Sequence, residues 1–436
     1  MDPLLLGLLS FVAIAVLIFI RIHVGTALII VAIGGFIVTQ GIDIALGSLQ
    51  YIPYAIVANY HFAVVPLFIL MGELVSASGL VSMLFEAAQA WLGRLKGGLG
   101  MAVVAMGAVL GAVTGSSLAA ASMMTRVSFP EMLKHKYDAG VSAGLIAAVS
   151  PLVLIIPPSI FLAFYGLIVF ESISQLLMAG LLPGLLAATI YMVLIYIRAM
   201  RNPQKFPTVE RHFTWRERMS AAKGIAPVIT MILIVLGGIY AGVFTASEGG
   251  AAGSIIAVIF VVALKRKKSG RVAFNAVWES AGMTSMVFYI IIGALLYGRF
   301  MAMTGATTQI IDSIATIQVS PYVTFAIIVV FYLILGCFLD ALSMMAITLP
   351  ITHPLIITLG FDPIWFGVVV VILAGAGTIT PPFGIDVFAV KGLVGDQVDL
   401  WRIFMGALPF VLAMLGVVIL MTIWPQIALF LPSIML

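Results

Sequence analysis

Charged residues and cysteine are scarce in this chain of 436 residues. Lysine, arginine, aspartate and glutamate together make up only 9% of it, and its one cysteine is Cys337. A single cysteine excludes an internal disulfide and any cysteine metal cluster. The five histidines show no paired metal-ligand spacing, and the sequence contains no glycine-rich phosphate-binding loop. We therefore expect no cofactor, and no ATP-driven transport by this chain itself.

Continuous apolar runs dominate the chain instead. Hydrophobic residues make up 63% of it, and the mean hydropathy is +1.24. A chain of this composition has more apolar surface than a soluble domain could bury. The runs do not alternate with polar residues, which favours helices over a barrel. The net charge of +4 indicates no nucleic-acid partner, because the basic residues lie in short loops. We predict an all-α polytopic protein of the lipid bilayer with about ten spans, near residues 4–20, 24–40, 52–75, 138–166, 175–197, 224–242, 247–264, 272–298, 362–390 and 403–424.

Two further apolar runs, 98–131 and 321–351, are each long enough for two short helices but have a glycine-rich middle. Non-helical backbone survives at membrane depth only where protein or a water-filled cavity covers it. We therefore predict two re-entrant hairpins whose tips mark a site. The more polar segments 78–97 and 305–320 precede the hairpins and suit interfacial arm helices, although an ordinary amphipathic loop helix would show the same pattern.

The chain contains two copies of one unit. The segment beginning at Gly115 reads GSSLAAASMM, and the segment beginning at Gly336, 221 residues later, reads GCFLDALSMM. A proline pair follows each of them. Repeats with helix breaks at corresponding places are typical of secondary transporters. The predicted first repeat is 1–200, with scaffold spans 4–75, arm 78–97, hairpin 98–131 and broken helix 138–166; the second is 224–436, with scaffold spans 224–298, arm 305–320, hairpin 321–351 and broken helix 362–390.

Basic residues predict the orientation of the two repeats. The densest basic loops, 198–223 and 265–271, are expected in the cytoplasm, and the first includes the linking loop 201–223. Lysine and arginine also flank the first hairpin, whereas neither occurs between Arg299 and Lys391. The first hairpin is therefore predicted to open to the cytoplasm and the second to the outside. The halves are then inverted, and both termini lie outside.

Hydroxyl groups and carbonyls freed at a helix break can together hold a hard cation such as sodium. Proline removes a backbone donor, so carbonyls before Pro157 and Pro381 lose helical partners. A proline pair in a membrane helix is also often only a kink, but the pairing of tips and breaks in both repeats argues against that here. Oxygen-bearing groups occur at the first tip and before the second break, namely Thr114, Ser116, Ser117, Gly377, Thr378 and Thr380.

Four charged residues are candidates for binding. Asp340 is the only charge in the second hairpin, and a carboxylate there is expensive unless it meets a cation or a donor. We expect it to lie beside a sodium site or to hold the tip. Asp386, just past the second break, either lines the cavity or faces the cytoplasmic vestibule. Arg126 and Arg299 are candidates for contact with an anionic substrate, although such arginines also snorkel to the interface.

An ordered set of motifs resembles one transporter family over essentially the whole chain. The motifs are PLFILMGELVSASG (66–79), GSSLAAASMM, IPPS (156–159), GVFTASEGG (242–250), GCFLDALSMMAITLPI and ITPPFG (379–384). They are similar to the large membrane (M) subunit of tripartite ATP-independent periplasmic (TRAP) transporters, the DctM-like family of the ion-transporter superfamily. The resemblance implies that the chain is a transporter and not an enzyme. It implies sodium-coupled uptake of a small organic acid across the bacterial inner membrane by an elevator motion. It also implies a small four-helix membrane subunit and a periplasmic substrate-binding protein as partners.

The resemblance further implies where ions and substrate bind. One sodium would lie among Thr114, Ser117, Gly336, Gly377, Thr380 and Phe383. A symmetry-related sodium would lie among Gly115, Ile156, Ser159 and Asp340. The candidate substrate contacts are Ser116, Pro158, Arg126, Arg299, Pro382 and Asp386. The chain departs from the family at Leu373 and Asp386, where asparagine is common, and this leaves the substrate contacts open.

Two other functions compete with this one. The first is a stand-alone anion carrier of the same fold that needs no binding protein; a neighbouring gene for a four-helix membrane protein would separate the two. The second is an intramembrane hydrolase, but Ser117 has no basic partner in its hairpin and Asp340 has no acidic one. The sequence does not identify the acid, because carboxylates, sugar acids and sulfonates are all compatible with it.

Overall fold

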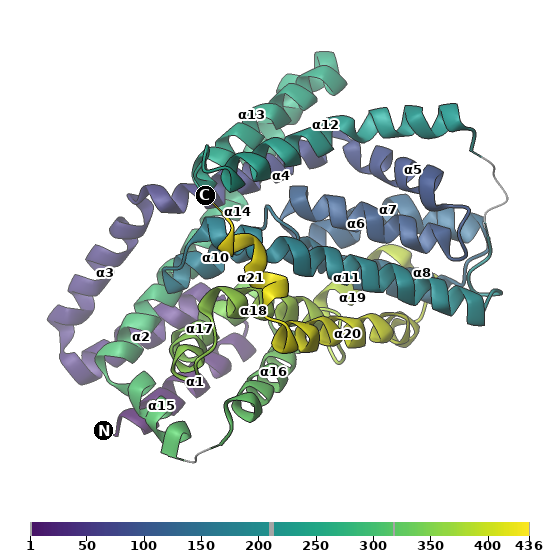
Figure 1. Ribbon diagram of the computed structural model, residues 1–436. Helices are drawn as coiled ribbons and strands as arrows, with labels where there is room; N and C mark the ends of the chain where they lie inside the picture. Colours follow the sequence, from purple (N-terminus) through teal and green to yellow (C-terminus); the bar gives the residue numbers. More distant parts are fainter. Residues whose placement is uncertain (1, 209–212, 317–318, 436) are drawn as a thin grey trace.

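The computed structural model describes residues 2–208, 213–316 and 319–435, and the side chains of residues 112–114 and 314–315 lie outside the description. The described chain consists of α-helices joined by short loops (Figure 1). Seven of its helical segments are long and apolar enough to cross a membrane, or eight if the pair bent by 46° at residues 156–159 is one span. The prediction of an all-α polytopic membrane protein is confirmed.

Several helices of the first half begin at residues with capping side chains. Asp2 caps α1 by accepting a hydrogen bond from the amide of Leu4 (3.1 Å), and Asp138 caps α8 by accepting one from Val141 (2.9 Å). Such caps satisfy amides that have no partner inside the helix. The elements are α1 (Pro3–Phe19), α2 (Val24–Gln40), α3 (Ile42–Val57), η1 (Tyr60–Ala63), α4 (Val64–Ser78), α5 (Leu80–Leu92), α6 (Gly98–Thr114), α7 (Ser117–Lys134), α8 (Ala139–Val149), α9 (Leu152–Ile155), α10 (Ile160–Val169) and α11 (Ile173–Arg201).

Capping boxes start the first two helices of the second half. Thr214 and Glu217 form the box of α12, and Thr245 and Glu248 form that of α13. The elements are α12 (Trp215–Tyr240), α13 (Ala246–Lys265), η2 (Arg266–Lys268), α14 (Ser269–Met303), α15 (Ala306–Thr316), α16 (Pro321–Phe338), α17 (Ala341–Thr358), α18 (Pro363–Gly377), α19 (Ile385–Val394), η3 (Gly395–Gln397), α20 (Leu400–Ile423) and α21 (Gln426–Ser433).

Two predicted boundaries differ from the structure, and one short helix has no predicted counterpart. The predicted span 52–75 is wrong as a single helix, because α3 and α4 are separate. Between them the chain turns at Asn59, whose side chain accepts a hydrogen bond from the amide of His61 (3.0 Å). α12 begins inside the predicted loop 201–223, because its capping box starts the helix at Trp215. The short helix α21 has no counterpart among the predicted elements.

The helices that lead into the two proline breaks form the centre of the molecule. All residues of α8 from Gly140 onward and all residues of α18 from Ile364 onward are buried. A helix that is apolar on every side is suited to such a position. α8 packs on α20 and on the first hairpin, and α18 packs on both helices of the second hairpin. Each break therefore lies against the tip region of its own repeat.

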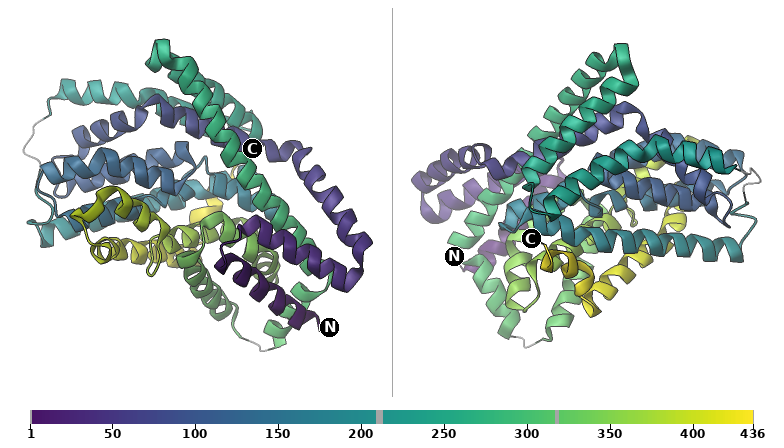
Figure 2. Two further views of the ribbon diagram at one scale, coloured as in Figure 1. Left: turned by 180° about the vertical axis from the view of Figure 1, so that it is seen from behind. Right: turned by 45° about the horizontal axis from the view of Figure 1, so that its top comes forward.

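A second group of helices, α2, α4, α13 and α14, packs together beside this centre. Figures 1 and 2 show α14 running obliquely across the molecule and α3 standing apart at one side. The main contacts of α3 are with α2 and α14, so much of its apolar surface is exposed, including Tyr54 at 75%. In a bilayer this surface meets lipid or another subunit. The division of the chain into a fixed scaffold and a moving part stays a prediction.

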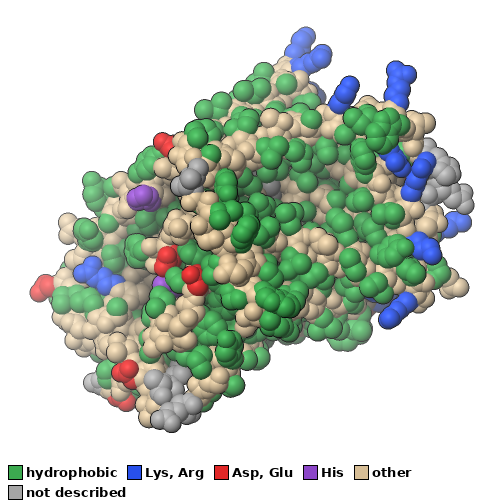
Figure 3. Space-filling model, in the orientation of Figure 1, with side chains coloured by type: hydrophobic (Ala, Val, Ile, Leu, Met, Phe, Trp, Pro, Cys, Tyr) green, Lys and Arg blue, Asp and Glu red, His purple; other side chains and the backbone are tan. Residues whose placement is uncertain are grey.

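Basic side chains gather at one end of the molecule. Figure 3 shows most lysines and arginines of that face over one end of α11, α12 and α13. Arg198 and Arg201 lie in the last turn of α11, and Lys265 ends α13. A cluster of this kind is typical of the cytoplasmic end of a membrane protein.

Candidate functional site

The first tip is a glycine turn followed by a serine cap. Gly115 has a φ of +56°, a conformation that favours glycine. A Cβ placed on it would lie 2.3 Å from Cδ1 of Ile160, the first residue after the first break. Ser116 then starts α7, its Oγ accepting a hydrogen bond from the amide of Ala119 (3.3 Å). The tip and the break of the first repeat are therefore in contact. The predicted ligand Thr114 ends α6, and its side chain lies outside the described residues.

The first break is buried throughout. Ile156 is 5% exposed and Ser159 is fully buried, and Pro158 between them is buried as well. The Ser159 hydroxyl donates to the carbonyl of Leu154 and accepts from the amide of Leu162 (3.3 Å). This serine therefore satisfies backbone groups on both sides of the break.

At the second tip the backbones of two helices touch. A Cβ on Gly377, at the end of α18, would lie 2.4 Å from Cα and 3.0 Å from the carbonyl oxygen of Gly336 on α16. Only two glycines allow this approach, because the obstructing atoms are backbone atoms that cannot move aside. The second tip and the second break therefore meet main chain to main chain.

Asp340 holds the second tip. Its Oδ1 accepts hydrogen bonds from the amides of Leu342 and Ser343, each at 3.1 Å, and its Oδ2 accepts one from the Ser343 hydroxyl. The residue is exposed. Among the described hydrogen bonds, none joins Asp340 to the first break. Two roles were predicted for Asp340, beside a sodium site or in holding the tip. The structure shows the second, because Asp340 caps α17.

The second break differs from the first in being partly open. Pro382 is exposed, and Phe383 is 52% exposed and packs at 5.3 Å from the ring of Phe338 at the second tip. The Thr380 hydroxyl donates to the carbonyl of Ala376 (2.6 Å). The two proline pairs thus lie in different environments, one in the interior and one at the surface.

Asp386 is the most unusual side chain of the site. It is fully buried, and its Oδ2 accepts a hydrogen bond from the Thr378 hydroxyl (2.9 Å). The side chains of Ser117, at the first tip, and Ser150, at the end of α8, face the same carboxyl. Its Oδ1 nevertheless has no hydrogen-bond partner among the described residues. A buried carboxylate oxygen without a donor is costly, so this position suits a bound cation.

The structure brings some predicted residues together and separates others. Ser117 meets the second break through Asp386, and Gly336 meets Gly377. The two arginines proposed to meet substrate lie elsewhere: Arg126 is exposed on α7, and Arg299 is exposed on α14. Arg299 lines a cavity of about 680 Å³ between α3, α14 and α17.

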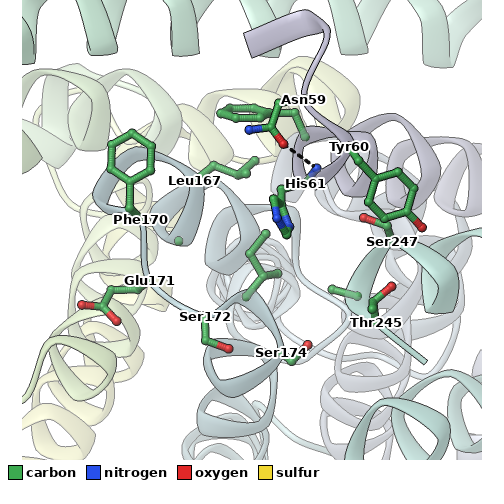
Figure 4. Close-up of a pocket in the computed structure, with 14 residues that line it drawn as sticks. Asn59, Tyr60, His61, Leu167, Phe170, Glu171, Ser172, Ser174, Thr245 and Ser247 are labelled. Carbon is green, nitrogen blue, oxygen red and sulfur yellow. Dashed lines mark hydrogen bonds between the residues drawn. The ribbon is translucent and has the colours of Figure 1, made fainter. Parts of the chain in front are cut away.

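A neighbouring cavity of about 400 Å³ lies where the loop after α10 approaches η1 and the start of α13 (Figure 4). In Figure 4 Asn59 and His61 lie on one side of it and Glu171 and Ser172 on another. Glu171 lies 3.9 Å from His353 of α17. Burial, together with the nearby charge of Asp362, raises the pKa of the Glu171 carboxyl above its ordinary value.

Sequence reasoning missed two polar groups of the interior. Ser150 precedes Pro151 in an apolar run, and this was the only signal that could have marked it. The second group joins the arms of the second hairpin: the Tyr332 hydroxyl is 2.8 Å from the hydroxyls of both Thr348 and Thr352. The spacing of Thr348 and Thr352, one helical turn apart, is the signal for a shared partner.

Sequence comparisons with known proteins agree on one family. A profile described as "Tripartite ATP-independent periplasmic transporter, DctM component" matches residues 11–427. The chain is 31% identical to the ectoine/5-hydroxyectoine TRAP transporter large permease protein UehC of Ruegeria pomeroyi, covering 84% of this chain and 85% of that one. It is 28% identical to the sialic acid TRAP transporter large permease protein SiaM of Vibrio cholerae, over 96% and 97% of the two chains. In fold it resembles the Alcanivorax borkumensis YdaH transporter, with a TM-score of 0.66 at 14% identity over 88% and 89% of the chains.

Proposed function

The chain belongs to the DctM family of tripartite ATP-independent periplasmic transporters, and we propose that it carries out sodium-coupled uptake of a small organic acid. As a large permease subunit it is a transporter and not an enzyme. The observation that carries the ion coupling is the buried carboxyl of Asp386 beside the first tip and the second break, one oxygen of which has no donor among the described residues. Hydroxyls and freed carbonyls around it are suitable ligands for a hard cation.

The substrate class is proposed from the relatives. Their names include transporters for C4-dicarboxylates, sialic acid, ectoine and isethionate. We propose a carboxylate, a sugar acid or a sulfonate as cargo. The candidate contacts at the tips and breaks are Ser116, Pro158, Pro382 and Asp386, with Arg126 and Arg299 placed at exposed positions outside them.

Two sodium sites follow from the two tip-and-break pairs. The first would combine Thr114, Ser117, Gly336, Gly377, Thr380 and Asp386, with Phe383 covering it. The second would combine Gly115, Ile156 and Ser159 with the second tip near Asp340. The contacts of Gly115 with Ile160 and of Gly336 with Gly377 show that tip and break lie together in each repeat.

Uptake should require sodium and rise with it more steeply than a hyperbola, because two ions bind. In proteoliposomes that contain the whole transport system, replacing sodium by choline should stop uptake of the cognate acid. Ser117→Ala removes a hydroxyl that faces Asp386 and should raise the sodium concentration for half-maximal uptake roughly tenfold, the effect of about one hydrogen bond to a charged group. Thr189→Ala, which removes an exposed hydroxyl on α11, is the matched control. Uptake that is unchanged in choline would end the proposal.

We further propose an elevator motion, in which tips and breaks move as one body against a scaffold of residues 4–75 and 224–298. The unwound backbone then stays with its ions and remains satisfied throughout. The arm helices suit this role, since α5 and α15 each follow a glycine with positive φ, Gly79 at +85° and Gly305 at +73°. Such glycines can absorb changes of backbone angle.

A crosslink between scaffold and hairpin should stop this motion. Ser76 directly follows the scaffold segment 4–75 on the same helix, α4, and is adjacent to Met123 of α7, with Oγ and Sδ 3.4 Å apart. Cysteines at both positions, in a Cys337→Ser background and joined by a short dithiol reagent, should abolish uptake, and reduction of the reagent should restore it. The control joins Tyr322 and Phe361, whose rings lie 5.7 Å apart within the moving body, and should keep uptake. Full transport through a verified crosslink of positions 76 and 123 would indicate local gating instead.

The proposed setting is the bacterial inner membrane, with both termini in the periplasm. The proposed partners are a small four-helix membrane subunit and a periplasmic substrate-binding protein, as the tripartite family implies. The competing function, a stand-alone anion carrier, predicts uptake at full rate without the binding protein. Omitting that protein from the proteoliposome assay therefore separates the two.

A further inference from the structure

A small basic pocket lies where α8, α11 and α20 meet. Its volume is about 180 Å³, and its wall includes Arg198, Lys205, Arg402 and Asp138. Arg402 Nη2 donates to Asp138 Oδ2 at 2.9 Å, so the lining contains one carboxylate for three cations. The pocket therefore keeps an excess of positive charge.

Arg198 is the cation of this pocket that lies against aromatic rings. Its guanidinium lies beside the rings of Phe206 and Phe410, 5.7 and 6.0 Å from their centroids. Its Nη1 is buried and has no hydrogen-bond partner among the described residues. Aromatic faces attract a cation but offer this N–H no oxygen acceptor. Because a buried donor without an acceptor is costly, the pocket suits an anionic oxygen supplied from outside the chain.

An apolar path leads away from the pocket along α20. Trp401 and Met405 line the pocket and are 61% and 50% exposed, and Leu408 and Leu412 follow at 38% and 62%. This spacing places the four side chains on one helix face. A free inorganic anion has no apolar part that could pack on these side chains, whereas the acyl chain of a lipid would cover them. Tryptophan beside the pocket is also the residue preferred at the edge of the hydrocarbon region.

We propose that this pocket binds an anionic phospholipid of the leaflet that it faces. Arg198, Lys205 and Arg402 would contact the phosphate, and one acyl chain would follow α20. Basic pockets between membrane helices are suited to such headgroups. The bound lipid would connect three segments: the start of α8, which leads to the first break, the end of α11 and the start of α20. The site is separate from the tips and breaks and does not depend on which acid or ion is transported.

The test uses the full-length chain in phosphatidylcholine nanodiscs to which phosphatidylglycerol is added. Native mass spectrometry measures the lipid retained, and thermal unfolding measures its effect on stability. The double variant Arg198→Gln/Lys205→Gln should bind phosphatidylglycerol roughly thirtyfold more weakly than wild type, and Lys205→Gln alone about fivefold. The control, Lys267→Gln/Lys268→Gln, loses the same charge at exposed positions of η2 and should bind as wild type does.

Three results would overturn the proposal. Equal retention of phosphatidylglycerol by wild type and by both pocket variants would exclude this pocket as the site. An equal loss in the control would indicate general charge attraction. The single variant at the exposed Lys205 decides the matter if the double variant fails to fold. Stabilisation by inorganic phosphate to the same extent as by phosphatidylglycerol would indicate a soluble anion instead of a lipid.

Discussion

Asp386→Asn is expected to abolish the response of the protein to sodium. The substitution keeps the size of the side chain and can keep the hydrogen bond from Thr378, but it removes the negative charge. Removing one partner of a buried ion pair costs about 3–5 kcal/mol, so sodium affinity should fall by roughly two orders of magnitude or more. Uptake at a fixed sodium concentration should fall with it.

Thermal unfolding of this variant gives a readout independent of transport. Without sodium the wild type has a buried carboxylate, one oxygen of which lacks a donor in the described part of the chain, so the variant should be at least as stable as the wild type. Adding sodium should raise the Tm of the wild type and leave that of the variant unchanged. Asp362→Asn is the control, because asparagine also caps the helix that Asp362 starts. A sodium-dependent rise of equal size in wild type and in Asp386→Asn would show that this carboxyl holds no cation.

Gly377→Ala should separate the second tip from the second break. The added methyl group would lie 2.4 Å from Cα of Gly336, and neither backbone can turn aside as a side chain would. Overpacking a core costs about 1–3 kcal/mol, and we expect the upper end of this range here. Uptake should fall at least tenfold, and the sodium-dependent rise in Tm should shrink, because the backbones of the two segments can no longer approach so closely.

The matched control is Gly416→Ala on α20, where an added Cβ would have no atom within 4 Å. In a helix interior this change should be neutral or slightly stabilising. Gly336→Ala should reproduce the defect of Gly377→Ala, since its Cβ would lie 2.8 Å from Cα of Gly377. Normal uptake and normal sodium response in both tip variants would mean that the close approach of these backbones is not needed for function.

The helical class, the helix pairs α6–α7 and α16–α17 and the interruptions at the two proline pairs could be predicted from the amino-acid sequence, because each depends on neighbours along the chain. An apolar run of about 20 residues can satisfy its backbone in a bilayer only as a helix. The turn at Gly115, the cap at Asp340 and the proline pairs are likewise local chemistry. Hydropathy predicted a single span over 52–75, and this was wrong because the apolar run continues across the turn at Asn59.

Which polar groups lie close together became clear from the three-dimensional arrangement of the helices. Ser117, Ser150, Thr378 and Asp386 come from four different segments, and no spacing in the sequence relates them. Their meeting depends on how closely α8, α18 and the hairpins approach, which is fixed by side-chain volume and by contacts such as Gly336 on Gly377. The same packing buries Pro158 and exposes Pro382, although the two proline pairs look alike in the sequence. Helix formation is local, whereas burial and the pairing of charges result from the packing of distant segments.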